Sequence, residues 1–197
     1  MFNGIIYNQG VLKKISVNKK GKSIFIFCKI SLNKKNIGMS IACDGICLTL
    51  VSIKNNILEF DLSQETINRT KFKYLKIGDF INLELPIKYG AYISGHICQG
   101  HVDTTSRVIN ISRKGKSRIM EFSVNKNNKK ILVEKASILI NGVSLTISKI
   151  TKKGFETWLI PHTLKLTNLS NIKIKSVVNI EFDILSKYVK NYISWEN

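Results

Sequence analysis

The feature that most constrains the fold of this chain is an internal repeat. The segment Ser40–Ile53 recurs as Ser137–Ile150, an offset of 97 residues, with Ser, Ile, Gly, Leu, Thr and the final Ile identical. The same offset aligns Thr66 with Thr163, Thr70 with Thr167, Asn82 with Asn179 and Glu84 with Glu181. An offset this long exceeds the period of solenoid repeats. The sequence therefore predicts two tandem copies of one small domain.

Short β-branched and aromatic runs, separated by turn residues, dominate both copies and are typical of strands. They predict strands at 2–7, 11–17, 23–30, 39–43, 46–53, 57–62 and 80–85, and then at 102–111, 117–124, 137–140, 143–150, 155–160 and 177–184. Asp44-Gly45 and Asn141-Gly142 stand between apolar runs at matching places, which is a strong hairpin signal. So many short strands in each copy favour an all-β fold with one small closed or Greek-key barrel per copy.

The two barrels are expected in residues 1–90 and 94–184, with the boundary in the segment after Pro86. Residues 65–75 and 162–170 are expected to form short helical or irregular connections. Residues 185–197 should form a helix, because apolar residues recur there at helical spacing: Ile184, Leu185, Tyr188, Val189, Tyr192 and Ile193. A helix outside two complete barrels must bury its apolar stripe. Packing on its own subunit and association between subunits both remain open.

The charge balance is strongly basic, with 31 Lys and Arg against 13 Asp and Glu and a net charge of +18. Such a balance suggests nucleic acid or an anionic membrane as a partner. The lysines, however, are scattered among many Asn and Ile, which an AT-rich coding background would also produce, and we favour that explanation. No apolar run is long enough for a membrane span. No secretory signal is recognisable and the four cysteines follow no disulfide or zinc-finger spacing, which favours a cytoplasmic protein.

Two of the three histidines, His96 and His101, flank Cys98. A zinc site is disfavoured because His101 would point away from His96 and Cys98 on a strand, and no fourth ligand is spaced nearby; we expect no metal. His101, preceded by Gly100, is either a functional imidazole or a surface histidine beside a turn. The residues alone leave both readings open.

Cys47 aligns with Ser144 across the repeat, and Leu-Thr follows each of them. A nucleophile or hydrogen-bonding group at one place in both copies suggests two related sites, whereas a small buried residue would fill a barrel equally well. Lys135 and Asp183 have ordinary explanations too, as a surface lysine and a cap of the tail helix. No P-loop, dinucleotide fingerprint or nucleophile elbow is present.

Four motifs together carry a family resemblance: Met-Phe-x-Gly-Ile-Ile at the start, the paired Gly-(Ile/Val)-(Cys/Ser)-Leu-Thr, Gly-His-x-x-x-Gly-His-Val-Asp, and Ile-Pro-x-Thr-Leu. Over essentially its whole length the chain resembles the riboflavin synthase α-chain family. The resemblance implies two six-stranded Greek-key barrels, a C-terminal helix that builds a homotrimer, and possible association with a lumazine synthase. It also implies dismutation of two 6,7-dimethyl-8-ribityllumazine molecules per site into riboflavin and 5-amino-6-ribitylamino-pyrimidinedione, without metal or organic cofactor.

The resemblance also implies two substrate sites. The first would contain Gly4, Ile5, Ile6, Cys47, Leu48, Thr49, Asp61, Leu62, Ser63, Gln64, Glu65 and Thr66. The second would contain Gly100, His101, Val102, Lys135, Ser144, Leu145, Thr146, Leu159, Ile160, Pro161, His162, Thr163 and Leu164. Candidate catalytic residues are Cys47, His101, Ser144 and Asp183, with Phe2 packing at the site and Ser40 hydrogen bonding nearby. Asn141 stands where the family usually has Asp, which would remove a charge near the second site.

Two other classes of function compete with this one. A non-catalytic lumazine- or flavin-binding paralogue would share both barrels, and the combined presence of Cys47, His101, Ser144 and Lys135 argues for the enzyme instead. A basic nucleic-acid-binding protein is disfavoured because no motif interleaves aromatic and basic residues.

Overall fold

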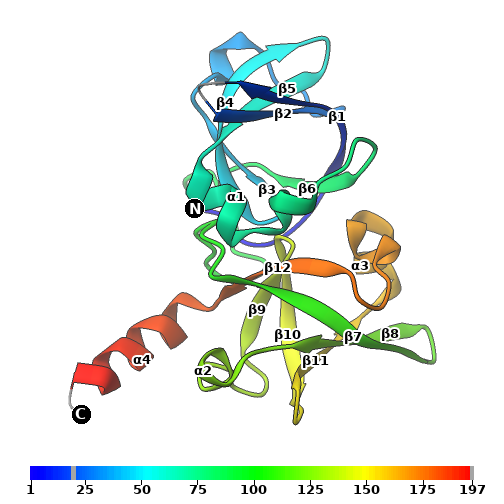
Figure 1. Ribbon diagram of the computed structural model, residues 1–197, viewed down its shortest axis with the longest axis vertical. Helices are drawn as coiled ribbons and strands as arrows, with labels where there is room; N and C mark the ends of the chain where they lie inside the picture. The colour runs from blue at the N-terminus through cyan, green and yellow to red at the C-terminus, as the bar shows by residue number, and fades with distance from the viewer. Residues whose placement is uncertain (19–20, 196–197) are drawn as a thin grey trace.

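The computed structural model describes residues 1–18 and 21–195 and contains two closed antiparallel barrels of six strands each. The first consists of β1 (Asn8–Asn18), β2 (Gly21–Phe27), β3 (Ser40–Cys43), β4 (Ile46–Lys54), β5 (Ile57–Leu62) and β6 (Phe80–Glu84). The second consists of β7 (Thr104–Lys114), β8 (Ser117–Ser123), β9 (Ser137–Ile140), β10 (Val143–Ile150), β11 (Gly154–Leu159) and β12 (Val177–Phe182). Their cyclic orders, β1-β2-β5-β4-β3-β6 and β7-β8-β11-β10-β9-β12, are the same. The all-β tandem-barrel prediction is confirmed (Figure 1).

Alternation along the strands explains the two cores. In β5, Leu58 and Phe60 are fully buried while Glu59 and Asp61 between and beyond them face outward. Successive side chains of a strand point to opposite faces, so one face of each strand fills its barrel. The β3–β4 hairpin turns at Asp44 and Gly45 with φ values of 48° and 77°, which is the left-handed geometry that the Asp-Gly pair predicts.

Residues 1–7 form an arm rather than the predicted strand. Only Phe2 pairs with another strand-like segment, in a single antiparallel bridge to Cys98. The arm then runs onto the second barrel, where Ile6 joins that barrel's buried core. We call residues 1–7 the N-terminal arm. The strand prediction was wrong because an apolar alternating run also suits an extended segment that crosses between two cores.

Residues 94–103 form the corresponding linker arm, which approaches the first barrel. Val102 belongs to the buried core of the first barrel, so the predicted strand at 102–111 begins two residues later, as β7. The two arms cross between the barrels, where Figure 1 also shows the N-terminus. The arm before the first barrel thus contributes Ile6 to the core of the second barrel, and the linker arm before the second barrel contributes Val102 to the core of the first.

A buried polar cluster joins the two barrels beside the crossing. The carboxylate of Asp44 pairs with the Lys71 ammonium at 2.6 Å and accepts a hydrogen bond from the Asn168 side chain at 2.8 Å. The Asn82 side chain donates to the Asn141 carbonyl at 2.9 Å and to Asn168 at 3.0 Å. Burial raises the pKa of Asp44, and the charge of Lys71 opposes that rise. Asn141 therefore serves the junction between barrels, where its uncharged side chain also contacts Asn168.

Short helices connect the strands, as predicted for residues 65–75 and 162–170. These are α1 (Gln64–Arg69) with η2 (Lys71–Tyr74), and α3 (Pro161–Leu166) with η3 (Asn168–Asn171). Two further helical turns, η1 (Lys34–Asn36) and α2 (Lys126–Lys129), lie in other loops.

The tail helix α4 (Ile184–Trp195) projects away from both barrels (Figure 1). Its apolar side chains are more than half exposed, namely Leu185, Tyr188, Val189, Tyr192 and Ile193. The apolar stripe of α4 is therefore not buried against its own subunit. No helix among residues 1–18 and 21–195 is long and apolar enough to cross a membrane.

Candidate active site

Ser144 lies where the N-terminal arm meets the second barrel. Its backbone N–H donates to the Gly4 carbonyl at 2.8 Å, and its Oγ is 2.7 Å from Nδ1 of His96. Gly4 has φ 75°, and a Cβ there would come within 2.7 Å of the Ser144 Cβ, so only glycine permits this approach. His96 is half-buried and is held by its backbone N–H donating to Asn3 at 3.2 Å.

The His96 imidazole is suited to accept a proton. Burial lowers its pKa from the usual value, and the Asp183 carboxylate opposes that change. A neutral imidazole at hydrogen-bond distance from a serine hydroxyl is the arrangement that activates serine as a nucleophile or proton carrier. Sequence reasoning placed Ser144 and Asp183 in the site and missed His96, which it weighed only as a metal ligand.

Cys47 occupies the matching place on the first barrel. Its backbone N–H donates to the Gly100 carbonyl at 2.8 Å, and Gly100 has φ 80° with no room for a Cβ against Cys47. Cys47 is half-buried, whereas the side chain of His101, the residue after Gly100, is exposed to solvent.

The structure associates the predicted residues differently from the grouping that the resemblance implied. Residues 4–6 lie against Ser144 of the second barrel, and residues 100–102 lie against Cys47 of the first. The sequence places each arm directly before its own barrel, and only the crossing of the arms reverses this association. Corrected, one cluster joins the N-terminal arm with residues 144–146, and the other joins the linker arm with residues 47–49.

The ends of β5 and β11 supply the remaining predicted residues. On the first barrel, Asp61 accepts a hydrogen bond from Ser23 at 2.7 Å, and Ser63 caps α1 by accepting from the Thr66 N–H at 3.0 Å. Exposed polar side chains gather here, including Gln64 and Glu65. On the second barrel Pro161 starts α3, and Leu159 is fully buried, so Leu159 can offer a ligand only its backbone.

The other predicted residues have clear structural roles. Phe2 is buried against Ala42, Cys98 and Leu139 at the crossing of the arms. Asp183 caps α4 by accepting from the Leu185 N–H at 2.9 Å, which confirms the capping interpretation. Lys135 adopts φ 69° in the loop before β9 and donates its backbone N–H to Ile147 at 2.8 Å. Ser40 pairs with Thr49 across the β3–β4 hairpin.

The cysteine between the two histidines is not suited to metal binding or nucleophilic attack. Burial raises the pKa of Cys98, and the nearby Glu181, Glu84 and Asp183 carboxylates raise it further. Its thiol donates to the His96 carbonyl at 3.1 Å. Among the described residues, no three His, Cys, Asp or Glu side chains gather closely enough to hold a metal ion.

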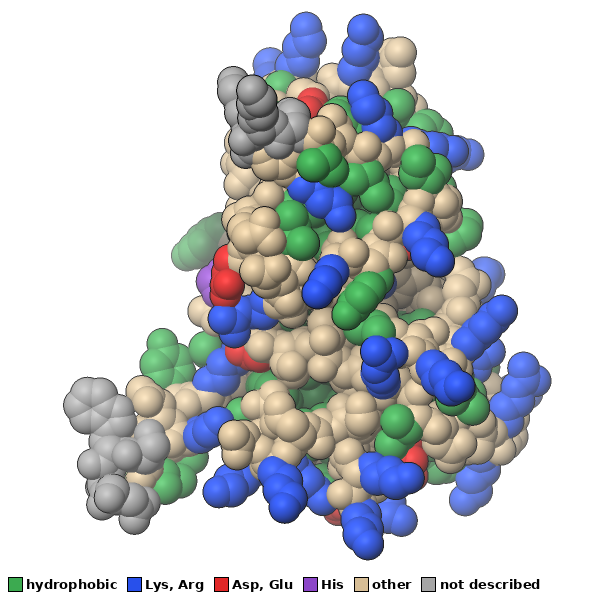
Figure 2. Space-filling view, viewed as in Figure 1, with side chains coloured by type: hydrophobic (Ala, Val, Ile, Leu, Met, Phe, Trp, Pro, Cys, Tyr) green, Lys and Arg blue, Asp and Glu red, His purple; other side chains and the backbone are tan. Residues whose placement is uncertain are grey.

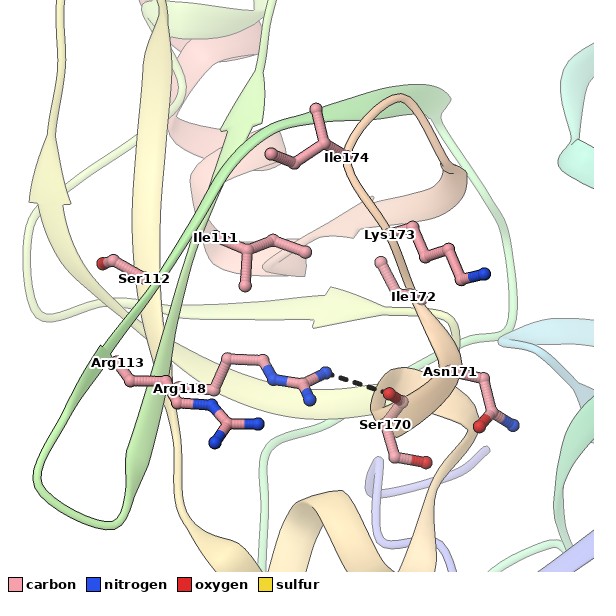
Figure 3. A pocket seen from close by; sticks show the side chains of 9 residues that line it. All are labelled: Ile111, Ser112, Arg113, Arg118, Ser170, Asn171, Ile172, Lys173 and Ile174. Atoms are coloured by element: carbon pink, nitrogen blue, oxygen red, sulfur yellow. Dashed lines mark hydrogen bonds between the residues drawn. The ribbon is translucent and has the colours of Figure 1, made fainter.

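A hollow of about 830 Å³ lies elsewhere, between the β7–β8 hairpin and residues 170–174 (Figure 3). Arg113, Arg118 and Lys173 line it, and Arg118 is tied to the Ser170 carbonyl at 2.9 Å. None of its lining residues belongs to the predicted sites. Smaller hollows do touch predicted residues, one of about 440 Å³ at Pro161 and Leu164 and one of about 250 Å³ at Ile5 beneath the N-terminal arm.

Lysine and arginine side chains are spread over the whole face seen in Figure 2, without a continuous basic groove. On this face, the distribution agrees with the explanation that the lysines reflect a coding background and not a binding surface.

Comparisons with known proteins identify the family of this chain. Residues 3–86 and 99–183 each match the family described as the lumazine binding domain. The riboflavin synthase of Photobacterium phosphoreum is 36% identical over 194 residues, covering 98% of this chain and 89% of that protein. The riboflavin synthase of Bacillus subtilis strain 168 is 34% identical over 197 residues, covering 100% of this chain and 92% of that protein.

Solved structures give the same result. LumP complexed with 6,7-dimethyl-8-(1'-D-ribityl) lumazine superposes with a TM-score of 0.79 at 28% identity, covering 92% of this chain and 98% of that chain. LumP complexed with riboflavin superposes with a TM-score of 0.78 at 28% identity, covering 92% and 99%. The resemblance inferred from the sequence motifs is confirmed: the chain belongs to the riboflavin synthase family of tandem lumazine-binding-domain proteins.

Proposed function

We propose that this chain is a riboflavin synthase, which converts two molecules of 6,7-dimethyl-8-ribityllumazine into riboflavin and 5-amino-6-ribitylamino-pyrimidinedione. One substrate molecule gives a four-carbon unit to the other. The observation that carries the proposal is the pair of related clusters around Cys47 and Ser144, each completed by the opposite arm. A reaction between two copies of one substrate needs two binding sites of the same kind, and a duplicated barrel provides them.

Each cluster offers what a flat ring with a polyol chain requires. Backbone groups of residues 47–49 and 144–146, and of the arms beside them, lie at strand edges and suit the ring. The hydroxyl and carboxylate groups of residues 61–66 suit the ribityl chain, and in residues 159–164 the side chains of His162 and Thr163 and the backbone groups would do so. Residues 4–6 would complete the second-barrel site and residues 100–102 the first-barrel site.

The reaction removes a proton from a C7 methyl group, so a positioned base is required. His96 with Ser144 is our candidate for this base. Cys47 and His101 would contact the second substrate molecule, bound on the first barrel. Holding two substrates in reacting contact can itself contribute about 7–11 kcal/mol.

We infer that the working enzyme is a homotrimer with active sites between subunits. The apolar face of α4 is exposed in the single chain and requires a partner. An odd number of subunits cannot pair like barrels throughout, so the first barrel of one subunit would face the second barrel of its neighbour. Cytoplasmic localisation stays a prediction from the sequence, and association with a lumazine synthase stays a prediction from the family resemblance.

A second candidate function is ligand binding without turnover, because the LumP structures hold lumazine or riboflavin. A turnover assay with 6,7-dimethyl-8-ribityllumazine separates the two. The native chain should form riboflavin, and Cys47→Ser and His101→Ala should each lower the rate about tenfold or more while the barrels stay folded. Binding of the substrate without product would reject the enzyme.

Mixed trimers test where the active site lies. One variant combines Cys47→Ser with Thr49→Ala on the first barrel, and the other combines Ser144→Ala with Thr146→Ala on the second barrel. His101 is left unchanged, because the linker arm places residues 100–102 with the first barrel's cluster. Co-expression should restore activity that neither variant has alone. No recovery in proven mixed trimers would place each site within one subunit.

A further inference from the structure

The N-terminal arm is held by a buried carboxylate from the last strand of the first barrel. Glu84, at the end of β6, accepts hydrogen bonds from the N–H groups of Asn3 at 2.8 Å and Gly4 at 3.1 Å. Both of its carboxylate oxygens bond to Gly4. The residue is only 8% exposed. A carboxylate this deeply buried is costly unless it is well hydrogen-bonded, and here backbone donors supply those bonds.

The second barrel repeats the arrangement with different surroundings. Glu181, at the end of β12, accepts from the N–H groups of Gln99 at 2.7 Å, Gly100 at 3.0 Å and His101 at 3.0 Å. It is 3% exposed. Glu84 and Glu181 are one another's counterparts in the repeat, so both copies bind their own preceding arm in the same way.

Each arm is also hydrogen-bonded to the opposite barrel. The carbonyl of Gly4, whose N–H Glu84 binds, accepts the Ser144 N–H of the second barrel. The carbonyl of Gly100, whose N–H Glu181 binds, accepts the Cys47 N–H of the first barrel. One glycine at each crossing is therefore held at its N–H by a carboxylate from one barrel and at its carbonyl by a strand of the other barrel.

We propose that Glu84 and Glu181 are positioning residues that act across the barrel junction, Glu84 on the Ser144 site and Glu181 on the Cys47 site. The inference rests on the proposed function, because it assigns these residues to substrate sites. Neither carboxylate contacts the site it serves; each sets the height and angle at which an arm lies over that site. The two carboxylates would thereby fix the positions of the Ser144 site and the Cys47 site relative to each other.

Double-mutant cycles test this crossed assignment. Glu84→Gln keeps the shape but replaces one acceptor oxygen with an NH₂ group, which opposes the arm's N–H donors. It is combined with Ser144→Ala and, separately, with Cys47→Ala, and kcat/KM and the affinity for 6,7-dimethyl-8-ribityllumazine are measured. Residues that share a network give non-additive effects, whereas independent residues give additive ones.

Glu84→Gln should couple to Ser144→Ala by about threefold or more and be additive with Cys47→Ala, although residues 84 and 47 belong to the same barrel. Glu181→Gln should show the reverse pattern. Glu59→Gln and Glu156→Gln make the same change on the outward faces of β5 and β11 and are the matched controls; they should couple to neither site. Coupling of Glu84 to Cys47 instead, or additivity with both residues in folded variants, overturns the proposal.

Two further measurements keep the result decisive. If Glu84→Gln does not fold, the cycles are run with Glu84→Asp, which keeps the charge and withdraws both oxygens by one methylene. In the native chain, the amide protons of Gly4 and Gly100 should exchange slowly with solvent, and rapid exchange rejects the proposed grip without reference to any ligand. If the native chain binds the lumazine but forms no riboflavin, the proposed function fails while the affinity cycles still decide this inference.

Discussion

At the scale of single residues, the two clusters differ in the side chains that meet there. In the second barrel's cluster, the imidazole of His96 reaches the Ser144 hydroxyl from the linker arm, with 2.7 Å between Nδ1 and Oγ. In the first barrel's cluster, Cys47 is joined to the linker arm through its backbone N–H, which donates to the Gly100 carbonyl at 2.8 Å.

His96→Gln should lower turnover by about a hundredfold, the lower range for loss of a general base. Because burial lowers the His96 pKa, native activity should fall only as the pH drops below the usual histidine range. That acidic limb should vanish in His96→Gln and in Ser144→Ala. The pH profile of kcat/KM measures both effects, and an unchanged profile in His96→Gln would show that another group is the base.

Glu84 should also make the fold sensitive to pH. Burial raises the pKa of Glu84 to about 7, and the hydrogen bonds from Asn3 and Gly4 oppose that rise. In the unfolded chain the pKa of a glutamate is about 4.3. The folded chain thus binds the proton more tightly, so this group's contribution to stability is full below about pH 4.3 and is lost as the pH rises through about 7.

Chemical unfolding at a series of pH values from about 4 to about 8 measures this dependence of the free energy of unfolding on pH. Glu84→Gln should show a weaker loss of stability toward high pH than the native chain, and exposed Glu65→Gln should follow the native curve. Parallel curves for Glu84→Gln and native protein would contradict the assignment.

At the scale of elements, α4 is attached to the barrels by few contacts. Lys187 pairs with Asp103 at 2.8 Å, and Asp183 caps the first turn, while the apolar face remains exposed. An amphipathic helix with its apolar stripe in water indicates a surface for association.

Truncation after Asp183 should therefore give folded monomers, because the buried cores of both barrels end at Phe182. Light scattering measures the mass, and circular dichroism checks that both barrels remain. Val189→Asp, which keeps the helix but places a charge on its apolar face, should also weaken association. A truncated chain that still forms trimers would exclude α4 from the interface.

At the scale of the whole molecule, the crossed arms make the two barrels interdependent. The core of the first barrel includes Val102 from the linker arm, and the core of the second includes Ile6 from the N-terminal arm. Residues 1–90 contain every strand of the first barrel, yet without Gly100–Val102 the Cys47 N–H loses its acceptor and the core loses an apolar residue.

A fragment of residues 1–90 should fold, bind the lumazine without forming product, and dimerise through its arms. Gly4 and Ile6 of a second copy can replace Gly100 and Val102, since the repeat aligns them. Asp44 and Lys71 pair within one copy and both lie in the fragment, so the buried charges remain balanced. Sedimentation should give twice the fragment mass, and fragment 8–90, which lacks the arm, should not dimerise. A folded monomeric 1–90 would contradict the exchange.

The sequence by itself determined the barrels. Period-2 apolar runs, the Asp44-Gly45 and Asn141-Gly142 turns and the repeat predicted the strands of both barrels, because side-chain alternation and turn geometry are local properties. The family motifs, likewise local, are the basis on which Cys47 and Ser144 are proposed as members of the two sites.

Only the tertiary structure decided which segments meet. Residues 1–7 have the apolar pattern of a strand, and nothing in that pattern tells whether Ile6 fills its own barrel or the other one. The partnership of His96 with Ser144, and the grip of Glu84 and Glu181 on the arms, join residues far apart in the sequence. Such contacts depend on how two completed cores pack together, and burial against a neighbouring core is a property of the assembled chain rather than of any segment.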